Sequence, residues 1–165
     1  MASASTASGR DPEIRPIADG DHDDLFAAFA RIVEDREGFP QEPPLSRPEF
    51  EDYWLAHSSA VMVARQSGRL AGAYYLKPNF VGRAAHIANA GYFVSAAFRG
   101  TGLGRRMVEH SLGEARRLGF DALQFNLVFE SNPARRLYEN LGFEVVGRVP
   151  RAVEGEDALI YWRAL

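Results

Sequence analysis

The apolar residues of this chain recur at helical spacing in several separate stretches. In residues 21–37 and 47–57 they fall near a period of about 3.6, which predicts two helices in the first third of the chain. The clearest pattern covers residues 102–118, with one apolar stripe made of Leu103, Met107, Leu112, Ala115 and Leu118. Gly119 follows directly, as expected for a residue that ends a helix in the left-handed conformation. A shorter helix is predicted over residues 133–140, closed by Gly142.

Between these helices the pattern becomes that of β-strands. Strands are predicted over residues 14–17, 60–65, 70–76, 87–95, 122–129, 143–149 and 158–162. Ser67-Gly68 stands between the second and third of these and predicts a tight hairpin. The order is one strand, two helices, an antiparallel run of strands and then strand, helix, strand, helix and two strands. It predicts an α/β fold with a central mixed, mostly antiparallel sheet and helices on both faces.

The chain is divided into a flexible N-terminal tail, residues 1–11, and one folded domain, residues 12–165. A length of 165 residues is usual for a single domain. The tail is rich in small and polar residues and lacks the apolar segment of a secretory signal. No stretch approaches the run of about 18 apolar residues that a transmembrane helix requires. We therefore expect a cytoplasmic protein that does not bind membranes.

Composition narrows the chemistry further. The chain is 46% hydrophobic and 25% charged, which suits a globular core and excludes intrinsic disorder of the domain. The net charge of −3 gives no general attraction to nucleic acid or to anionic membranes. The absence of cysteine excludes disulfides, thiol nucleophiles and thiolate metal sites, and the four histidines are too scattered to predict a metal. Lys77 is the only lysine, an imbalance that we attribute to coding bias.

The most informative segment is the turn Arg99-Gly100-Thr101-Gly102-Leu103-Gly104-Arg105-Arg106, between a predicted strand and the strongest predicted helix. Glycines let the backbone approach a ligand closely, and the free amides of a helix N-terminus favour an anion. A dinucleotide fingerprint requires glycine where Arg105 stands, and a P-loop requires Gly-Lys-Ser/Thr at this point. A tight turn that binds nothing is the structural alternative.

The spacing that remains, Arg-x-x-Gly-x-Gly, resembles the acetyl-CoA pyrophosphate loop of the GCN5-related N-acetyltransferase (GNAT) family. The later segment Asn132-x-Ala134-x-x-x-Tyr138-x-x-x-Gly142-Phe143 is similar to the second motif of that family. With their neighbouring strands, the two motifs cover roughly residues 60–165. The resemblance implies a single-domain GNAT fold with acetyl-CoA as cosubstrate, and the scattered histidines leave no metal expected.

The resemblance also implies where the cosubstrate binds. Its contacts would be Phe93, Val94, Arg99, Gly100, Thr101, Gly102, Leu103, Gly104, Arg105 and Asn132. The backbone amides of the turn would hold the diphosphate, helped by the side chains of Arg99 and Arg105. The pantetheine arm would lie between strands 87–95 and 122–129, where a bulge is expected at Gly91 and an amide near Phe93 would polarise the thioester oxygen. Asn132, which precedes Pro133, also suits a helix N-cap.

Tyr138 stands at the general-acid position of the family. With a pKa of about 10, a tyrosine is protonated at neutral pH and can donate a proton to a departing thiolate, whose conjugate thiol has a pKa of about 8.5. The alternative is an aromatic residue packed beside Leu137 and Leu141. The strand over residues 87–94 carries no carboxylate base; Glu130 is near in sequence, and a chain of water molecules is the fallback.

The segments 78–80, 86–91 and 125–129 resemble the fungal proline-analogue acetyltransferases, which acetylate azetidine-2-carboxylate and related imino acids. Two asparagines bind the acceptor in that subgroup, and they match Asn89 and Asn126. An asparagine inside an apolar strand needs polar partners, so the other interpretation is that each satisfies a strand bulge. We expect an N-acetyltransferase for a small-molecule amine, an amino or imino acid, and consider a homodimer. The alternatives are an acetyltransferase for protein N-termini or lysine side chains and a non-catalytic acyl-CoA-binding domain.

Overall fold

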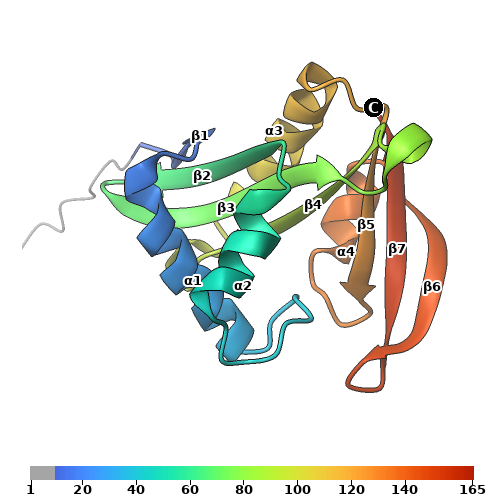
Figure 1. The fold of residues 1–165 in the computed structure, drawn as a ribbon, viewed down its shortest axis with the longest axis horizontal. Helices are drawn as coiled ribbons and strands as arrows, with labels where there is room; N and C mark the ends of the chain where they lie inside the picture. The colour runs from blue at the N-terminus through green and yellow to red at the C-terminus, as the bar shows by residue number, and fades with distance from the viewer. Residues whose placement is uncertain (1–9) are drawn as a thin grey trace, which may run out of the picture.

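The computed structural model describes residues 10–165, so the first nine residues of the predicted tail lie outside the described residues. The fold is one seven-stranded sheet in the order β1-β2-β3-β4-β5-β7-β6, flanked by helices (Figure 1). The strands are β1 (Glu13–Pro16), β2 (Ala60–Gln66), β3 (Arg69–Pro78), β4 (Ile87–Val94), β5 (Ala122–Phe129), β6 (Glu144–Val153) and β7 (Glu156–Ala164). The helices are α1 (His22–Glu34), α2 (Arg47–Phe50), α3 (Leu103–Arg117) and α4 (Arg135–Asn140).

All the predicted strands form, and the predicted sheet type is confirmed. Only β4 and β5 pair in parallel, and the other neighbours pair antiparallel. Ser67 and Gly68 form the predicted tight hairpin, with φ angles of 50° and 76°. β6 runs four residues past its predicted end, to Val153, because its backbone pairs with β7 even where its side chains are polar and exposed.

The helices divide between the two faces of the sheet and bury separate cores. α1 and α2 lie on one face, where Leu25, Phe29, Phe50 and Trp54 are fully buried. The predicted helix 47–57 is α2 continued by a π-helical segment, Glu51–Ala56, which carries Trp54 into that core.

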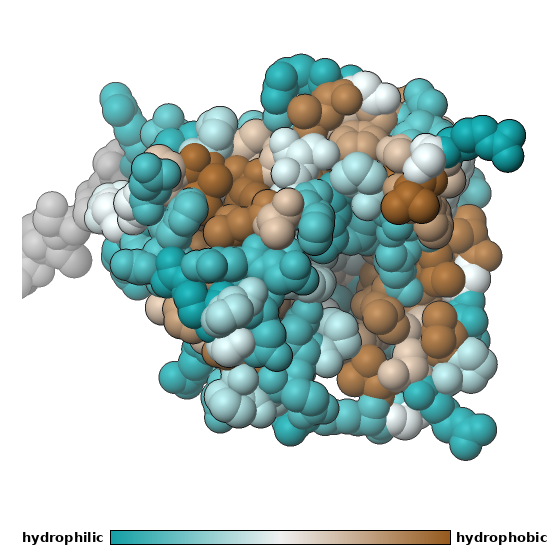
Figure 2. Space-filling view, in the orientation of Figure 1, coloured by the Kyte–Doolittle hydropathy of each residue, from teal (hydrophilic) through white to brown (hydrophobic). Residues whose placement is uncertain are grey.

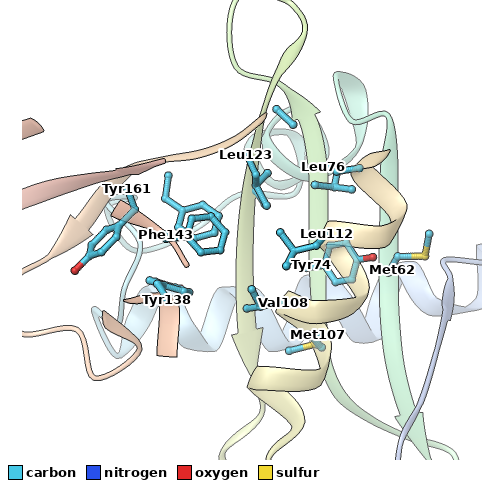
Figure 3. Packing of buried hydrophobic residues seen from close by; sticks show 14 of the residues in the cluster. Met62, Tyr74, Leu76, Met107, Val108, Leu112, Leu123, Tyr138, Phe143 and Tyr161 are labelled. Atoms are coloured by element: carbon cyan, nitrogen blue, oxygen red, sulfur yellow. The ribbon is translucent and has the colours of Figure 1, made fainter. Parts of the chain in front are cut away.

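α3 and α4 cover the opposite face. Figure 3 shows residues of this second core, with Tyr138, Phe143 and Tyr161 on one side of Leu123 and the side chains of α3 on the other. None of the helices within residues 10–165 combines the length and apolarity that crossing a membrane requires.

The sheet opens between β4 and β5, and this opening positions the site. The two strands pair at only three positions, Ile87 with Ala122, Ala88 with Leu123 and Asn89 with Gln124. Beyond that point β4 continues to Val94 and β5 to Phe129 without pairing with each other. Figure 1 shows the consequence: β1–β4 run across the view, whereas β5–β7 run nearly perpendicular to them.

The expected bulge at Gly91 is wrong. Gly91 pairs in regular register with Tyr75 of β3, and the irregularity lies in β5 instead, between Phe125 and Val128. A glycine is required at position 91 because a Cβ atom there would lie 2.6 Å from Cε1 of the Tyr75 ring. The residue thus provides room for an aromatic ring rather than a break in the strand.

Candidate active site

A cleft of about 910 Å³ occupies the opening between β4 and β5. Its lining includes Tyr75, Lys77 and Asn89, whose positions on β3 and β4 point to the α1–α2 side of the sheet. It also includes Val108 and Tyr138, which belong to the core on the α3–α4 side. The cleft therefore connects the two faces through the sheet. Figure 2 shows this face hollowed at its centre, with mostly hydrophilic residues over α1 and hydrophobic ones gathered over β5–β7.

The glycine-rich turn leads into the N-terminus of α3 beside the cleft. Gly100 and Gly102 have φ angles of 74° and 85°, which side chains with a Cβ atom rarely adopt. The first amides of α3, from Leu103 to Arg105, have no partner within the helix, and the helix dipole adds partial positive charge there. Gly104 lines the cleft, and a Cβ atom on it would meet only Val94 and Leu137, at 3.8 and 4.0 Å. This arrangement fits a diphosphate.

The side chains of this turn are already engaged within the protein. Thr101 Oγ1 donates to the carbonyl of Phe98 at 2.6 Å, and Leu103 is buried in the core, so both offer a ligand mainly their backbone. Arg105 Nε donates to Glu109 at 2.9 Å on the exposed side of α3. Of the two predicted arginines, only Arg99 lines the cleft.

Tyr138 projects from α4 into the aromatic cluster beside the cleft. Its ring centroid lies 4.7 Å from that of Phe125, 6.0 Å from that of Phe143 and 5.8 Å from that of Tyr161. Burial raises the pKa of the Tyr138 phenol far above its ordinary value, so the hydroxyl keeps its proton. That hydroxyl has no hydrogen-bond partner within residues 10–165 and is free to donate to a ligand in the cleft.

The backbone of β4 offers amides to the cleft in alternation. Ser95 N–H donates to the carbonyl of Ala71 at 2.9 Å, so the amide of Ser95 and the amide of every second residue before it point toward β3. The amide of Phe93 therefore belongs to the β3–β4 ladder. The amides of Tyr92 and Val94 face the opening, and both residues line the cleft, so these are the donors near Phe93 that a ligand can reach.

The two asparagines lie on the α1–α2 side of the opening. Asn89 stands at the last β4–β5 pair, where its Nδ2 donates to the carbonyl of Gln124 at 3.0 Å and its Oδ1 lies 3.4 Å from the hydroxyl of Tyr75. Asn126 lies in the irregular part of β5 and exchanges hydrogen bonds with Asn79 at 2.6 and 3.1 Å. Both line the cleft and both have polar partners, as the strand-bulge interpretation also requires.

Two further sequence candidates have clear positions. Asn132 Oδ1 accepts from the amide of Ala134 at 2.9 Å, so it caps the turn that begins α4, and it also lines the cleft. Glu130 pairs with Arg148 at 2.5 Å and does not line the cleft. Within residues 10–165 no group of three or more histidine, aspartate or glutamate side chains is arranged to hold a metal ion.

Sequence reasoning missed several residues that line the cleft, among them Tyr53, Tyr75 and Lys77. The Tyr53 and Tyr75 hydroxyls lie 2.9 Å apart, and Lys77 Nζ lies 4.3 and 4.4 Å from the two ring centroids. The one available signal was that Lys77 is the only lysine of the chain. The position of Lys77 in the cleft, however, depends on the pairing of β3 with β4, which the sequence does not show.

The sequence pattern of the Acetyltransferase (GNAT) family matches residues 25–143. The chain belongs to the GNAT acetyltransferase family. Its curated relatives include N-acetyltransferase aca1 of Schizosaccharomyces pombe, 33% identical over 152 residues, which cover 78% of this chain and 73% of aca1. The family, the fold and the N-acetyltransferase activity predicted from the two motifs are thereby confirmed.

Solved structures agree with this GNAT assignment. A GCN5-related N-acetyltransferase from Kribbella flavida is 32% identical and superposes with a TM-score of 0.86, covering 93% of this chain and 98% of the other. The structure of yncA from Salmonella typhimurium, solved with its cofactor acetyl-CoA, shares the fold at 19% identity, with a TM-score of 0.82 and coverage of 94% and 95%. Acetyl-CoA is the cosubstrate of this GNAT enzyme.

Proposed function

We propose that this GNAT enzyme acetylates the amine of a small α-imino or α-amino acid. The observation that carries the proposal is the polar cluster on the α1–α2 side of the cleft, which includes Asn89 and Asn126 beside the strand opening. Amide side chains can accept from an amine and donate to a carboxylate, so the pair suits an acceptor that carries both groups. The resemblance of these strands to the proline-analogue acetyltransferases supports the same class of acceptor.

The proposed chemistry is direct transfer. The diphosphate of acetyl-CoA binds at the turn from Arg99 to Arg105, and an amide of β4 that faces the opening, that of Tyr92 or of Val94, polarises the thioester carbonyl. The nitrogen lone pair of the acceptor attacks the carbonyl carbon, the carbon–sulfur bond breaks, and Tyr138 gives its proton to the departing thiolate. Phe93 and Asn132 complete the walls around the acetyl-CoA arm.

The proton of the amine must leave by another route. The only acidic side chain that lines the cleft within the described residues is Glu37, which is paired with Arg99. A relay of water molecules to bulk solvent, or an acceptor whose amine has a lowered pKa, meets this need. Activity should therefore rise with pH through the alkaline range as the amine loses its proton.

A thiol-release assay tests the proposal with azetidine-2-carboxylate, proline analogues and a lysine peptide at equal concentrations. Asn89→Ala and Asn126→Ala should each raise the acceptor KM by about 10-fold or more while the KM for acetyl-CoA is unchanged. Asn140→Ala, an exposed substitution at the end of α4, is the matched control. Preference for the peptide, with unaltered kinetics in both cleft variants, would refute the proposal in favour of a protein-modifying enzyme.

Three further expectations stay predictions: a domain boundary at residue 12, a cytoplasmic location and a homodimer. Part of the segment before residue 13 contacts the domain, since the carbonyl of Arg10 accepts from Gln66 at 2.5 Å and that of Pro12 accepts from Arg106 at 2.9 Å. Light scattering at several protein concentrations would establish the assembly.

A further inference from the structure

We propose that Lys77 binds the carboxylate of the acceptor and so selects acceptors with an acid group next to the amine. This role rests on the proposed function and adds to it the residue that recognises the acid group. Lys77 lies on β3 directly opposite Asn89, and the two side chains project from the same face of the sheet into the cleft.

The ammonium group of Lys77 is held in one place. Its Nζ lies over the rings of Tyr53 and Tyr75, 4.3 and 4.4 Å from their centroids, and donates to the carbonyl of Tyr53 at 3.2 Å. An ammonium group has three donors, and only one has a hydrogen-bond acceptor within the described residues. The Tyr53 hydroxyl in turn contacts that of Tyr75 at 2.9 Å, which fixes the two rings against each other. The remaining donors are therefore presented in a fixed position.

The charge of Lys77 is also uncompensated. Two arginines line the same cleft, and each is paired: Arg36 with Glu42 and Glu154, and Arg99 with Glu37. Within residues 10–165, by contrast, no carboxylate lies within ion-pair distance of Lys77. Burial lowers the pKa of Lys77, and only the more distant charge of Asp52 opposes that shift. A half-buried ammonium group without a counter-ion gains stabilisation when an anion enters beside it.

The position of Lys77 suits an α-imino or α-amino acid in particular. In such a molecule the carboxylate carbon and the amine nitrogen share one carbon atom. A carboxylate held beside Lys77 and Asn89 keeps the amine close to the last β4–β5 pair, where the sheet opens toward Val94. An amine without a neighbouring acid group would leave the ammonium unpaired, and this difference provides selectivity.

The experiment compares two acceptors that differ only in charge, azetidine-2-carboxylate and azetidine-2-carboxamide, with wild-type enzyme and with Lys77→Met. We expect Lys77→Met to lower kcat/KM for the carboxylate by about 10- to 100-fold, mainly through KM, and to leave the carboxamide nearly unchanged. Lys77→Arg should restore part of the loss because it keeps the charge. Arg83→Met, which removes an exposed positive charge outside the cleft, is the control and should affect neither acceptor.

Calorimetry of azetidine-2-carboxylate with the enzyme–CoA complex gives a readout that does not depend on turnover, and Lys77→Gln serves if the methionine variant is unstable. An equal loss of kcat for both acceptors would overturn the inference, because it would indicate a base or a structural residue. Wild-type enzyme that uses both acceptors equally well would overturn it too, while leaving the proposed function intact. Wild-type enzyme that prefers a peptide would instead refute the proposed function itself.

Discussion

The guanidinium of Arg99 is paired with the carboxylate of Glu37, with Nη2 donating to Oε2 at 2.5 Å. Glu37 follows α1, Arg99 begins the glycine-rich turn, and both line the cleft. Both side chains are about half exposed, so the pair adds little to stability. A diphosphate bound at the turn would have to compete with Glu37 for Arg99.

Removal of that competitor should tighten cosubstrate binding. We expect Glu37→Gln to lower the Kd for acetyl-CoA by about 2- to 5-fold at low salt, and the gain should fade at high salt. Calorimetry at two ionic strengths measures the effect, and Glu114→Gln at the far end of α3 is the control. The same gain in an Arg99→Ala background would show that Glu37 acts by another route.

Gly104 and Gly113 give a matched pair on one helix. Both lie in α3, but only Gly104 lines the cleft, and a Cβ atom on Gly113 would meet nothing within 4 Å. Alanine at either position should favour the helix slightly, by about 0.5–1 kcal/mol. Gly104→Ala should nevertheless weaken acetyl-CoA binding by about 10-fold, because the methyl group occupies the approach to the helix amides. Equal affinities in the two variants, measured by calorimetry beside their melting curves, would place the diphosphate elsewhere.

Tyr138→Phe should lower kcat by about 100-fold or more and leave the melting temperature nearly unchanged. The reason is that the hydroxyl has no partner within the described residues, so its removal breaks no internal bond. Since burial raises its pKa, wild-type activity should not decline through ionisation of Tyr138 anywhere below about pH 10.

Tyr161→Phe is the matching control, since Tyr161 belongs to the same aromatic cluster but donates to Glu139 at 2.8 Å and does not line the cleft. It should lose stability rather than turnover. Single-turnover rates for the two variants would separate the cases, and wild-type chemistry in Tyr138→Phe would make Tyr138 a packing residue.

Asp21 should contribute stability that depends on pH. Its buried carboxylate accepts from Arg15 at 2.7 and 3.0 Å, from the amide of Ala18 at 2.8 Å and from Arg65 at 2.7 Å. The pKa of Asp21 is lowered, most of all by the hydrogen bond from Arg15. Burial raises this pKa, but the hydrogen bonds from Ala18 and Arg65 lower it further. A lowered folded-state pKa stabilises the protein above the unfolded value of about 3.9, and this stabilisation is lost as pH falls below it.

Asp21→Asn should therefore cost about 2–3 kcal/mol at neutral pH, and the difference from wild type should shrink between about pH 4 and pH 2. Urea unfolding at several pH values measures it. A difference that stayed constant over this range would mean that packing, and not charge, accounts for the loss.

The sequence predicted those parts of the fold and site that depend on local pattern. The apolar stripe of α3, the glycines before it and the hairpin at Ser67-Gly68 all have local causes, and each stands where it was expected. The two motifs placed Tyr138 and Gly104 beside one cleft because both belong to elements next to the strand opening.

The errors and omissions arise where strands meet. Gly91 predicts a bulge when β4 is considered alone, and only its register with Tyr75 shows that an aromatic ring requires the space. In the sequence, Lys77 is notable only as the single lysine of the chain, and its pairing with Asn89 is what places it in the cleft. Cross-strand neighbours are set by the whole sheet, so a single strand carries little information about them.

The three-pair contact of β4 with β5 gives this sheet two interior edges in addition to its outer ones. Exposed edges invite pairing with other chains, and the outer edges carry familiar protection: β1 is four residues long and ends in Pro16, and the pairing of β6 shifts register twice. The interior edges need no such residues. Their free amides, among them that of Val94, lie inside a cleft of about 910 Å³, between helices on both faces. Because these amides lie inside the cleft and not along the outside of the sheet, the protein keeps unpaired strand edges for its cosubstrate without adding an outer edge that another chain could extend.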